Sequence, residues 1–471
     1  MRLNEITIIE ASEGLKNKKF TAVELTRACL DVAKAKNKEL NAYITICEES
    51  ALAEAARADE IIAAGKQQPL TGIPFSVKDA ICTVNIRSTG AGKILDNYIA
   101  PYEASVIGKI RAQGGVLIGK TNCDAFGHGA SNENSMYGPV KNPHDLKKVS
   151  GGSSGGAAAS VAAHTCIYAI AEDTGGSIRQ PASFCGVVGL RPSYGRNSRY
   201  GIMPMASSLD TVGPMTKTVA DCAIVMGEIS GSDARDATTV PDAVPDYSKQ
   251  ISKKKKFTIG VPKEYFELDG MEPEVKKIIE EKISALEKAG HKIVPVSLPY
   301  TKYAIPVYYI VVPSEDSSNL GRLDGIRYGV RADANNLYDI YAKSRALGFP
   351  EEVKRRIMIG TYALSAGYYD AYYRKAQKVR TLIIRDFEKV FETVDLLITP
   401  TSPYPAFDIG AKKDDVLAMY LADVFVSPAA VAGLPAISVP AGMTAAGLPV
   451  GAQIIGPRLH ESEVMNLAKQ I

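Results

Sequence analysis

Apolar side chains near the start of the chain recur at helical spacing. Residues 21–24 (Thr-Ala-Val-Glu) have the form of a capping box, in which a threonine and a glutamate satisfy the first N–H groups of a helix. The apolar residues that follow fall near one helical face, at Leu25, Cys29, Leu30 and Val32. These positions predict a helix from Thr21 to about Lys36, and an alanine-rich segment predicts a second helix over about 48–64.

Short apolar runs then alternate with helical segments. Residues 73–78, 116–119 and 185–190 predict buried strands, and residues 104–112 predict a helix. Strands that alternate with helices are typical of an α/β layer fold.

The same alternation continues in the second half of the chain. Residues 257–261 and 291–296 predict strands on either side of a helix that begins near Pro273 and ends near Gly290. We expect this crossover unit to join the same sheet and not to form a separate domain. A tyrosine-rich helical region over about 355–391, a strand over 395–400 and a hairpin of residues 434–440 and 450–455 complete the pattern.

Composition and charge argue against a dedicated nucleic-acid binder. The 471 residues are 46% hydrophobic and 23% charged, which is enough for a large core, and the net charge is only +3. A basic stripe would be expected of a nucleic-acid-binding domain. The longest run of basic residues is the four lysines at 253–256, which precede an apolar strand and are typical of a solvated loop.

Cysteine and histidine usage indicates a reducing compartment. The seven cysteines are odd in number and contain no CxxC pair, and the five histidines are scattered, so neither a disulfide framework nor a metal site is expected. No signal-peptide core follows Met1, and no apolar run reaches the roughly 20 residues of a membrane span. The sequence predicts a soluble, cytoplasmic protein that has no contact with a membrane.

The chemistry is indicated by two Gly-Gly-Ser turns, which end at Ser153 and Ser177, 24 positions apart. Glycines let the backbone take unusual dihedrals and approach a bound group closely, and a serine after such a turn can present its hydroxyl. Lys78 lies upstream in an apolar run and can supply a base. One such turn is a weak signal, whereas two turns with this lysine are a strong one.

These segments resemble a known family. The runs GIPFSVKD (72–79), GGSSGG (151–156) and DTGGSIRQPA (173–182) are similar to the motifs of the amidase-signature family of serine hydrolases. The resemblance covers nearly the whole chain, and within the family it is nearest to the glutaminase subunits of tRNA-dependent amidotransferases. It implies an α/β fold with one large mixed β-sheet covered by helices on both faces. The single domain would span 1–471, with an N-terminal helical cover (1–66), a catalytic signature core (67–230) and a second half of the same sheet that carries substrate-binding residues (250–471).

The resemblance implies a Ser–cis-Ser–Lys triad. Ser177 attacks the amide carbonyl and forms an acyl-enzyme, and Ser153, which follows a cis peptide bond in the family, passes the proton to Lys78. Lys78 must be neutral to accept that proton, so we expect burial among the apolar residues around it to lower its pKa. The oxyanion hole would be formed by backbone N–H groups of Thr174, Gly175, Gly176 and Ser177.

Glutamine binding requires a cation and an anion at the far end of the pocket, because glutamine carries an α-carboxylate and an α-ammonium. The resemblance points to Arg356 for the carboxylate, since a guanidinium can grip it with two hydrogen bonds. It points to Asp423 for the ammonium and to Tyr308 as a pocket wall. The sequence leaves open whether Arg355 and Tyr309 take these places instead.

The resemblance also implies partners. Ammonia freed from glutamine would pass to a second subunit of a heterotrimer with subunits B and C. The partner subunit would bind ATP and Mg²⁺ and most of the misacylated tRNA, which carries glutamate or aspartate. This chain would then hold no metal and no cofactor.

Several alternatives stay open at this point. A free-standing amidase would use the same triad but would not need Arg356 or Asp423, and a non-catalytic scaffold would need none of these residues. Residues 114–121 match the phosphate-binding loop pattern GxxxxGK[ST], although their Val-Leu-Ile run is typical of a strand. A histidine could also serve as the base, since triad members need not be neighbours in the chain.

The chain departs from the family pattern near the site. Ala171 and Glu172 precede Asp173, where the family tends to have small residues, and Cys123, the loop 127–129 and residues 430–431 also differ. We expect residues 127–131 to border the pocket and these changes to affect specificity more than the triad. Arg179 is expected to pair with a buried carboxylate such as Asp173, and Ser154 to make a supporting hydrogen bond.

Overall fold

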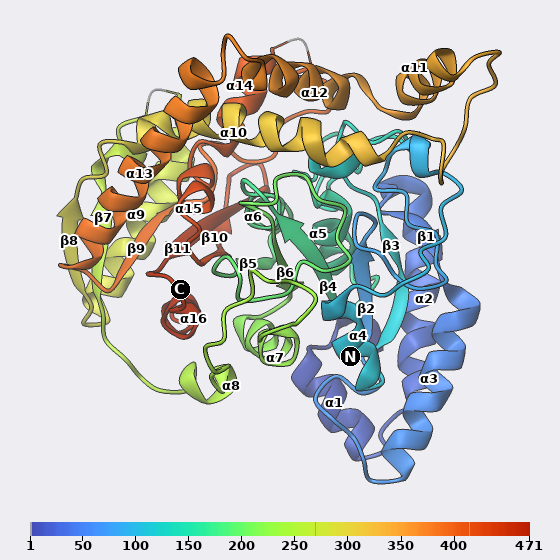
Figure 1. Cartoon of the computed structure of the whole chain (residues 1–471). Helices are drawn as coiled ribbons and strands as arrows, with labels where there is room; N and C mark the ends of the chain where they lie inside the picture. The colour runs from blue at the N-terminus through green and yellow to red at the C-terminus, as the bar shows by residue number, and fades with distance from the viewer. Residues whose placement is uncertain (1, 269, 414) are drawn as a thin grey trace.

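One 11-stranded sheet runs through the molecule (Figure 1). The computed structural model describes residues 2–268, 270–413 and 415–471. The strands are β1 (Tyr43–Ile46), β2 (Pro74–Lys78), β3 (Val116–Thr121), β4 (Tyr168–Asp173), β5 (Val188–Arg191), β6 (Thr211–Thr216), β7 (Thr258–Pro262), β8 (Lys292–Val296), β9 (Leu396–Pro400), β10 (Ala436–Met443) and β11 (Pro449–Ile455). The helices are α1 (Ile8–Lys16), α2 (Ala22–Leu40), α3 (Glu48–Ala63), α4 (Ser105–Ala112), α5 (Gly155–Ala162), α6 (Arg179–Cys185), α7 (Val219–Ile229), α8 (Tyr247–Gln250), α9 (Pro273–Lys288), α10 (Ala304–Asn319), α11 (Leu337–Gly348), α12 (Glu351–Leu364), α13 (Lys375–Phe391), α14 (Val416–Tyr420), α15 (Ser427–Val431) and α16 (Glu461–Ala468).

The sheet is mixed, and its strand order is β1-β3-β2-β4-β6-β5-β10-β11-β9-β7-β8. β3, β2 and β4 are parallel neighbours, and so are β9, β7 and β8. The strands between these groups pair antiparallel, including the predicted hairpin β10–β11. The predicted crossover unit β7–α9–β8 joins the same sheet, which confirms that expectation.

Both faces of the sheet are covered, as expected. In β9, Leu396 and Ile398 belong to one hydrophobic core, whereas Leu397 belongs to another, so alternate side chains pack against different layers. Residues of α10, α13 and α15 fill the second core, and residues of α7 and α16 help to fill the first. Figure 1 shows α10 and α13 on one side of the strands and α7 and α16 on the other. Strands buried on two faces explain the continuous apolar runs in the sequence.

The predicted helices form with small changes at their ends. The Thr21 hydroxyl accepts from the Glu24 N–H (3.1 Å), and the Glu24 carboxylate accepts from the Thr21 N–H (2.7 Å), so the capping box is confirmed. The tyrosine-rich region is helical but interrupted, which differs from a single run over 355–391. Helix α12 ends before Ser365, whose backbone is extended, and a π-helical turn (Asp370–Arg374) leads into α13.

Residues 114–121 do not form a phosphate-binding loop. Most of them belong to β3, and the side chain of Lys120 is fully buried. Its ammonium donates to the Ile81 carbonyl (2.6 Å) and to the Ser88 hydroxyl (2.7 Å). Because this lysine is bound inside the protein and its backbone pairs with β1 and β2, the segment cannot wrap around a phosphate.

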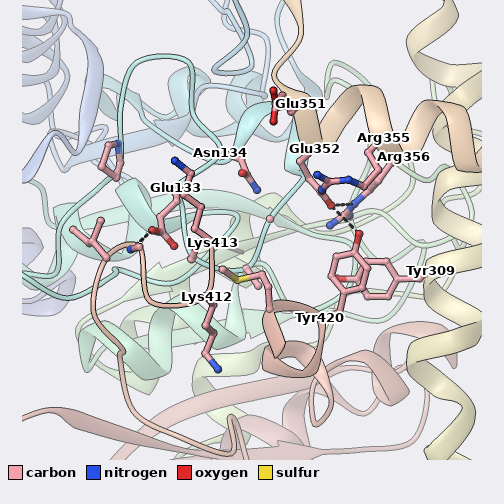
Figure 2. A pocket seen from close by; sticks show the side chains of 17 residues that line it. Glu133, Asn134, Tyr309, Glu351, Glu352, Arg355, Arg356, Lys412, Lys413 and Tyr420 are labelled. Atoms are coloured by element: carbon pink, nitrogen blue, oxygen red, sulfur yellow. Dashed lines mark hydrogen bonds and ion pairs between the residues drawn. The ribbon is translucent and has the colours of Figure 1, made fainter. Parts of the chain in front are cut away.

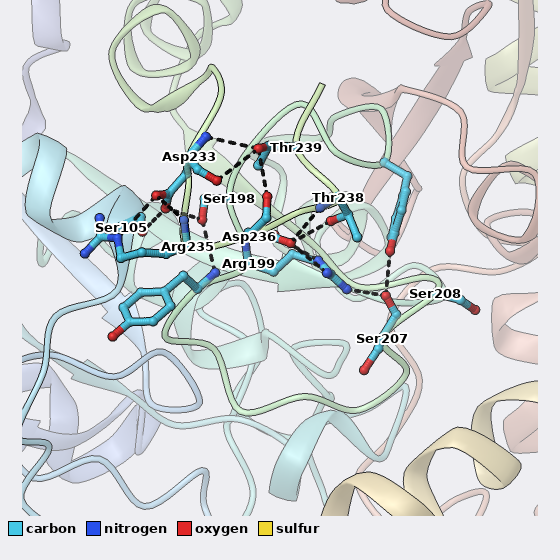
Figure 3. A network of polar contacts seen from close by, with 12 residues as sticks. Ser105, Ser198, Arg199, Ser207, Ser208, Asp233, Arg235, Asp236, Thr238 and Thr239 are labelled. Atoms are coloured by element: carbon cyan, nitrogen blue, oxygen red, sulfur yellow. Dashed lines mark hydrogen bonds and ion pairs between the residues drawn. The ribbon is translucent and has the colours of Figure 1, made fainter. Parts of the chain in front are cut away.

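A polar network fixes the long loop after β5 (Figure 3). Asp236 binds the guanidinium of Arg199 through both carboxylate oxygens, at 2.8 and 3.1 Å. Asp233 accepts from the hydroxyls of Ser198 (2.7 Å) and Ser105. These contacts hold the loop that leads to Asp210, which lies beside the site described next.

The seven cysteines are all free. None of the helices in the described ranges is long and apolar enough to cross a membrane.

Candidate active site

Sheet topology brings the predicted triad together at the carboxyl ends of the central parallel strands. β2 and β4 are parallel neighbours, so their carboxyl ends lie together, where open α/β sheets usually bind ligands. Lys78 is the last residue of β2, and the turn that carries Ser177 follows β4 directly. Ser153 lies in the turn that precedes α5. The structure therefore places all three residues at the same end of the central strands.

Lys78 and Ser153 form a buried pair. The Lys78 ammonium nitrogen is 2.7 Å from the Ser153 hydroxyl oxygen, and both side chains are fully buried. The Gly152–Ser153 peptide bond is cis, and the Gly152 N–H donates to the Gln180 side chain (2.9 Å). A Cβ at Gly152 would lie 2.2 Å from the Asp124 carboxylate, so only glycine fits there.

The turn of Ser177 is packed against that of Ser153. The Ser154 N–H donates to the Ser177 carbonyl (3.2 Å), which joins the two Gly-Gly-Ser turns. Gly176 has φ +151°, and a Cβ there would lie 2.2 Å from Val426. Among the described residues, the N–H groups of positions 174–177 donate to no protein acceptor. They are therefore available for an oxyanion, as the oxyanion-hole hypothesis requires.

Asp173 fixes the turn of Ser177 through its buried carboxylate. Its carboxylate pairs with Arg179 (3.1 Å) and Arg191 (2.9 Å), so the predicted Arg179–Asp173 pair is confirmed. Burial alone would raise the pKa of Asp173, but the two guanidinium groups hold it below its usual range. The carboxylate also accepts from the Ile178 N–H (3.1 Å), which fixes the start of α6.

Glu172 lies beside the triad. Its carboxylate is 3.1 Å from the Lys78 ammonium, and both side chains are buried. Burial raises the pKa of Glu172, while the charge of Lys78 acts in the opposite direction. The Ser154 hydroxyl donates to the Glu172 carbonyl (3.1 Å), which is the supporting bond expected of Ser154. The sequence marked Glu172 as a departure from the family but assigned it no role.

A pocket of about 660 Å³ opens next to these turns (Figure 2). Residues 129–131 line it, so the expectation that this loop borders the pocket is confirmed. Tyr309 and Tyr420 stack with their ring centroids 3.6 Å apart, and the guanidinium of Arg356 lies 5.0 Å from the Tyr309 centroid. Arg356 and the Tyr420 hydroxyl both donate to one oxygen of Glu352, at 2.8 and 3.1 Å. Figure 2 shows these side chains pointing toward one another at one wall.

The structure distinguishes the neighbouring residues that the sequence left open. Both arginines line the pocket, but Arg356 is 3% exposed, whereas the Arg355 side chain is 44% exposed and pairs with the other carboxylate oxygen of Glu352. Tyr309 lines the pocket, whereas Tyr308, the residue expected as a pocket wall, packs against the turn of Ser177. A Cβ at Gly175 would lie 2.5 Å from the Tyr308 ring.

Asp423 is buried next to the turn of Ser177. A Cβ at Gly176 would lie 3.5 Å from its carboxylate oxygen. Burial raises the pKa of Asp423 to about 8, although the positive charge of Arg356 acts against the shift. Asp423 therefore lies beside the turn of Ser177 and feels the charge of Arg356, which lines the pocket.

The histidine contacts do not support the alternative in which a histidine acts as the base. The ring of His128 is buried and lies 2.9 Å from the Asp316 carboxylate. None of the histidines hydrogen-bonds to a serine within the described part of the chain. No group of three acidic, histidine or cysteine side chains is placed to hold a metal in the same residues.

Sequence reasoning missed two members of the pocket wall, Glu352 and Tyr420. Glu352 could have been found, because it precedes Arg356 by four residues and such pairs meet on a helix. Tyr420 lies on α14, far from α12 in sequence, and no pattern indicated that the two would meet.

Comparisons with known proteins agree with this geometry. The family model described as Amidase matches residues 24–465. A relative from Koribacter versatilis, named as the A subunit of glutamyl-tRNA(Gln) amidotransferase, is 52% identical and covers 100% of this chain and 98% of its own. A relative of the same name from Geobacter metallireducens is 51% identical, with coverage of 99% and 97%.

Solved structures show the same fold. The crystal structure of the glutamyl-tRNA(Gln) amidotransferase A subunit from Thermotoga maritima matches with a TM-score of 0.82 and 40% identity, covering 100% of this chain and 94% of that one. A 6-aminohexanoate cyclic dimer hydrolase in complex with its substrate matches with a TM-score of 0.85 and 25% identity, with coverage of 99% and 96%.

Proposed function

This chain belongs to the amidase family, and from that premise we propose that it is the glutamine-hydrolysing subunit of a tRNA-dependent amidotransferase. The observation that carries the proposal is identity at about half of all positions, over the full length, to relatives named as the A subunit of that enzyme. The site supports it, because the buried Arg356 lines the pocket and the buried Asp423 lies beside Gly176 in the turn of Ser177.

The triad accounts for acylation. Ser177 attacks the side-chain carbonyl of glutamine, and its proton passes to Ser153 while the proton of Ser153 passes to Lys78. The N–H groups of residues 174–177 stabilise the oxyanion of the tetrahedral intermediate. As the C–N bond breaks, the proton returns from Lys78 through Ser153 to the leaving nitrogen, and ammonia departs. Water then hydrolyses the acyl-enzyme by the same relay and releases glutamate.

The pocket accounts for the choice of substrate. Arg356 would bind the α-carboxylate of glutamine, and the stacked rings of Tyr309 and Tyr420 hold its guanidinium in place. Asp423 would bind the α-ammonium near Gly176. The Tyr308 ring packs against Gly175 in the turn of Ser177.

The ammonia would serve a reaction in a second subunit. We expect a heterotrimer with subunits B and C, in which the partner uses ATP and Mg²⁺ to activate glutamyl-tRNA(Gln), or aspartyl-tRNA(Asn), for amidation. The triad chemistry requires no metal or nucleotide in this chain. The complex would work in the cytoplasm, where tRNA is charged.

One observation favours a second candidate, a free-standing amidase. Arg356 is already bound to Glu352, so a substrate carboxylate has to compete with an internal one. The shared fold with a cyclic dimer hydrolase shows that this architecture also occurs in an enzyme that is not named as part of an amidotransferase.

Ammonia release separates the two candidates. The purified chain would be given glutamine with and without subunits B and C, beside Ser177→Ala. We expect turnover that rises with the partners and disappears in the variant. Ser177-dependent cleavage of simple amides without any glutamine turnover would overturn the amidotransferase proposal.

A further inference from the structure

Two consecutive acids at the end of β4 have very different surroundings. Asp173 is satisfied by two arginines and a backbone N–H. Glu172 is equally buried, yet neither of its oxygens accepts a well-directed hydrogen bond from the described residues. The partner of Glu172 is the ammonium of Lys78, 3.1 Å away. A carboxylate with a purely structural role would be expected to have partners like those of Asp173.

This contact raises a problem for the triad. A lysine beside a carboxylate tends to keep its proton, and a protonated lysine cannot accept one from Ser153. The chemistry therefore requires a place for the lysine proton before or during the attack. The buried Glu172 carboxylate is in contact with the nitrogen that must give up the proton.

We propose that Glu172 is a positioning residue that acts through Lys78 and takes up its proton as Ser177 attacks. The inference rests on the proposed function in one respect, namely that Ser177 is the nucleophile. As the bond from the Ser177 oxygen to the carbonyl carbon forms, one proton moves from Ser177 to Ser153, one from Ser153 to Lys78 and one from Lys78 to Glu172. When the C–N bond breaks, the same protons move back and the last one reaches the leaving nitrogen, so no proton is gained or lost.

The protonation states of the pair make this exchange reasonable. Burial raises the pKa of Glu172, because a low-dielectric surrounding disfavours the charged carboxylate. Moving one proton from Lys78 to Glu172 changes no net charge of the pair.

Other titratable groups face the pair and have to be separated from it. His128 lies on the loop next to Glu172 and is paired with Asp316. Asp210 and Asp124 are buried, and burial raises the pKa of each to about 7. Burial also raises the pKa of the nearby Cys82 and Cys123 thiols. All of these groups remain in a Glu172 variant, but the charge of Glu172 contributes to the raised pKa of Asp210, so a Glu172→Asp variant, which keeps that charge, is needed beside Glu172→Gln.

The test compares the wild-type chain with Glu172→Gln over pH 6 to 10. Two rates are measured: hydrolysis of the amide, and labelling of Ser177 by a fluorophosphonate, in which the serine oxygen bonds to phosphorus and fluoride leaves. The second rate reports on serine activation without substrate recognition. At pH 7 we expect both rates of the variant to fall by at least about 10-fold, because general acid–base steps contribute factors of this size or more. The rates of the variant should recover at higher pH, where hydroxide in the solvent can take the proton that Glu172 no longer accepts.

A purely electrostatic role for Glu172 predicts the opposite change in the two rates. If Glu172 only holds Lys78 in its charged form, its removal makes the neutral amine more available, and Glu172→Gln is as fast as the wild type or faster at pH 7. That result would overturn the proposal. Glu172→Asp keeps the carboxylate, so its rates should depend on pH as those of the wild type do, with a lower maximum rate. A Glu172→Asp profile with the shape of the Glu172→Gln profile would also overturn it.

Controls separate this proposal from the one on which it rests. Glu461→Gln removes another buried glutamate, which accepts from the Ser193 N–H (2.9 Å), and it should leave both profiles unchanged. Labelling and hydrolysis that persist in Ser177→Ala would refute the nucleophile assignment and both proposals. Loss of both in Ser177→Ala, with Glu172→Gln behaving like the wild type, would refute the role of Glu172 alone.

Discussion

The edge of the central sheet and the helical wall of the pocket hold their functional side chains by different means. At the sheet edge, Lys78 and Ser153 are fully buried, and the turns that carry the two serines are joined by a backbone hydrogen bond. Across the pocket, Arg356 is held by stacked tyrosines and by Glu352, all on helices outside the sheet. Strand register and tight glycine turns therefore position the reacting groups, whereas side-chain packing positions the groups that would choose the substrate.

This difference has a consequence for mutation. A change at the sheet edge acts on groups that touch the reacting atoms and have no room to adjust, so it should act on turnover. A change in the helical wall alters side chains that border an open pocket of about 660 Å³, so it should act on binding. The following predictions test that division, beginning with the largest effect.

Lys78→Met should abolish turnover and also lower stability. Loss of a triad member typically costs about 10⁴-fold or more in kcat. The variant also leaves Glu172 buried without its partner, which is costly until the carboxyl group takes up a proton. Ammonia release measures the first effect and thermal unfolding measures the second.

The double variant Lys78→Met/Glu172→Gln separates the two effects. It removes the unpaired carboxylate, so it should regain thermal stability relative to Lys78→Met while staying inactive. Turnover within about 10-fold of wild type in either variant would show that Lys78 is not the base, since general-base catalysis contributes more than that.

Arg356→Ala should act on the KM for glutamine. Hydrogen bonds to charged groups contribute about 1.5–3 kcal/mol, which corresponds to a rise in KM of about 10- to 150-fold with a smaller change in kcat. Arg355→Ala is the matched control, because that side chain is largely exposed and should change KM by less than about 3-fold. Steady-state kinetics with glutamine and with a simple primary amide measure both. The assignment of Arg356 to the glutamine carboxylate would be contradicted if Arg355→Ala raised KM as much as Arg356→Ala. It would also be contradicted if Arg356→Ala raised the KM for the simple amide as much as the KM for glutamine.

Much of the fold could be predicted from the sequence because its signals are local. The capping box at Thr21, the crossover around α9 and the β10–β11 hairpin all depend on residues close together in the chain, and each is confirmed. Both serines of the candidate triad follow glycine turns that stand out in the same way. The break between α12 and α13 was missed because helical spacing of the tyrosines continues across it.

The contacts that decide the chemistry could not be predicted in this way. Val77 pairs with Ile170, so strand alternation places Glu172 on the same face of the sheet as Val77. Glu172 nevertheless contacts Lys78, because the contact is made where both strands end. The pocket wall depends on α14 meeting α12, and the pairing of Tyr309 with Tyr420 follows from tertiary packing alone. Long-range contacts of this kind leave no periodic signal in the sequence.

The smallest effect is expected from the ionisation of Asp423. Burial raises the pKa of this carboxyl group to about 8, so below that pH it is mostly neutral and cannot pair with the α-ammonium of glutamine. The KM for glutamine should therefore fall by about 10-fold as the pH rises from 6.5 to 8.5, while the ammonium of free glutamine, whose pKa lies above that of a peptide N-terminus, keeps most of its charge. Asp423→Asn, which cannot ionise, should hold KM at its high value across that range. A primary amide without an ammonium should show no such trend in either protein. A wild-type KM that does not change with pH would mean that the helical wall recognises glutamine without this carboxylate, and Arg356 would then be the main charged determinant of substrate choice.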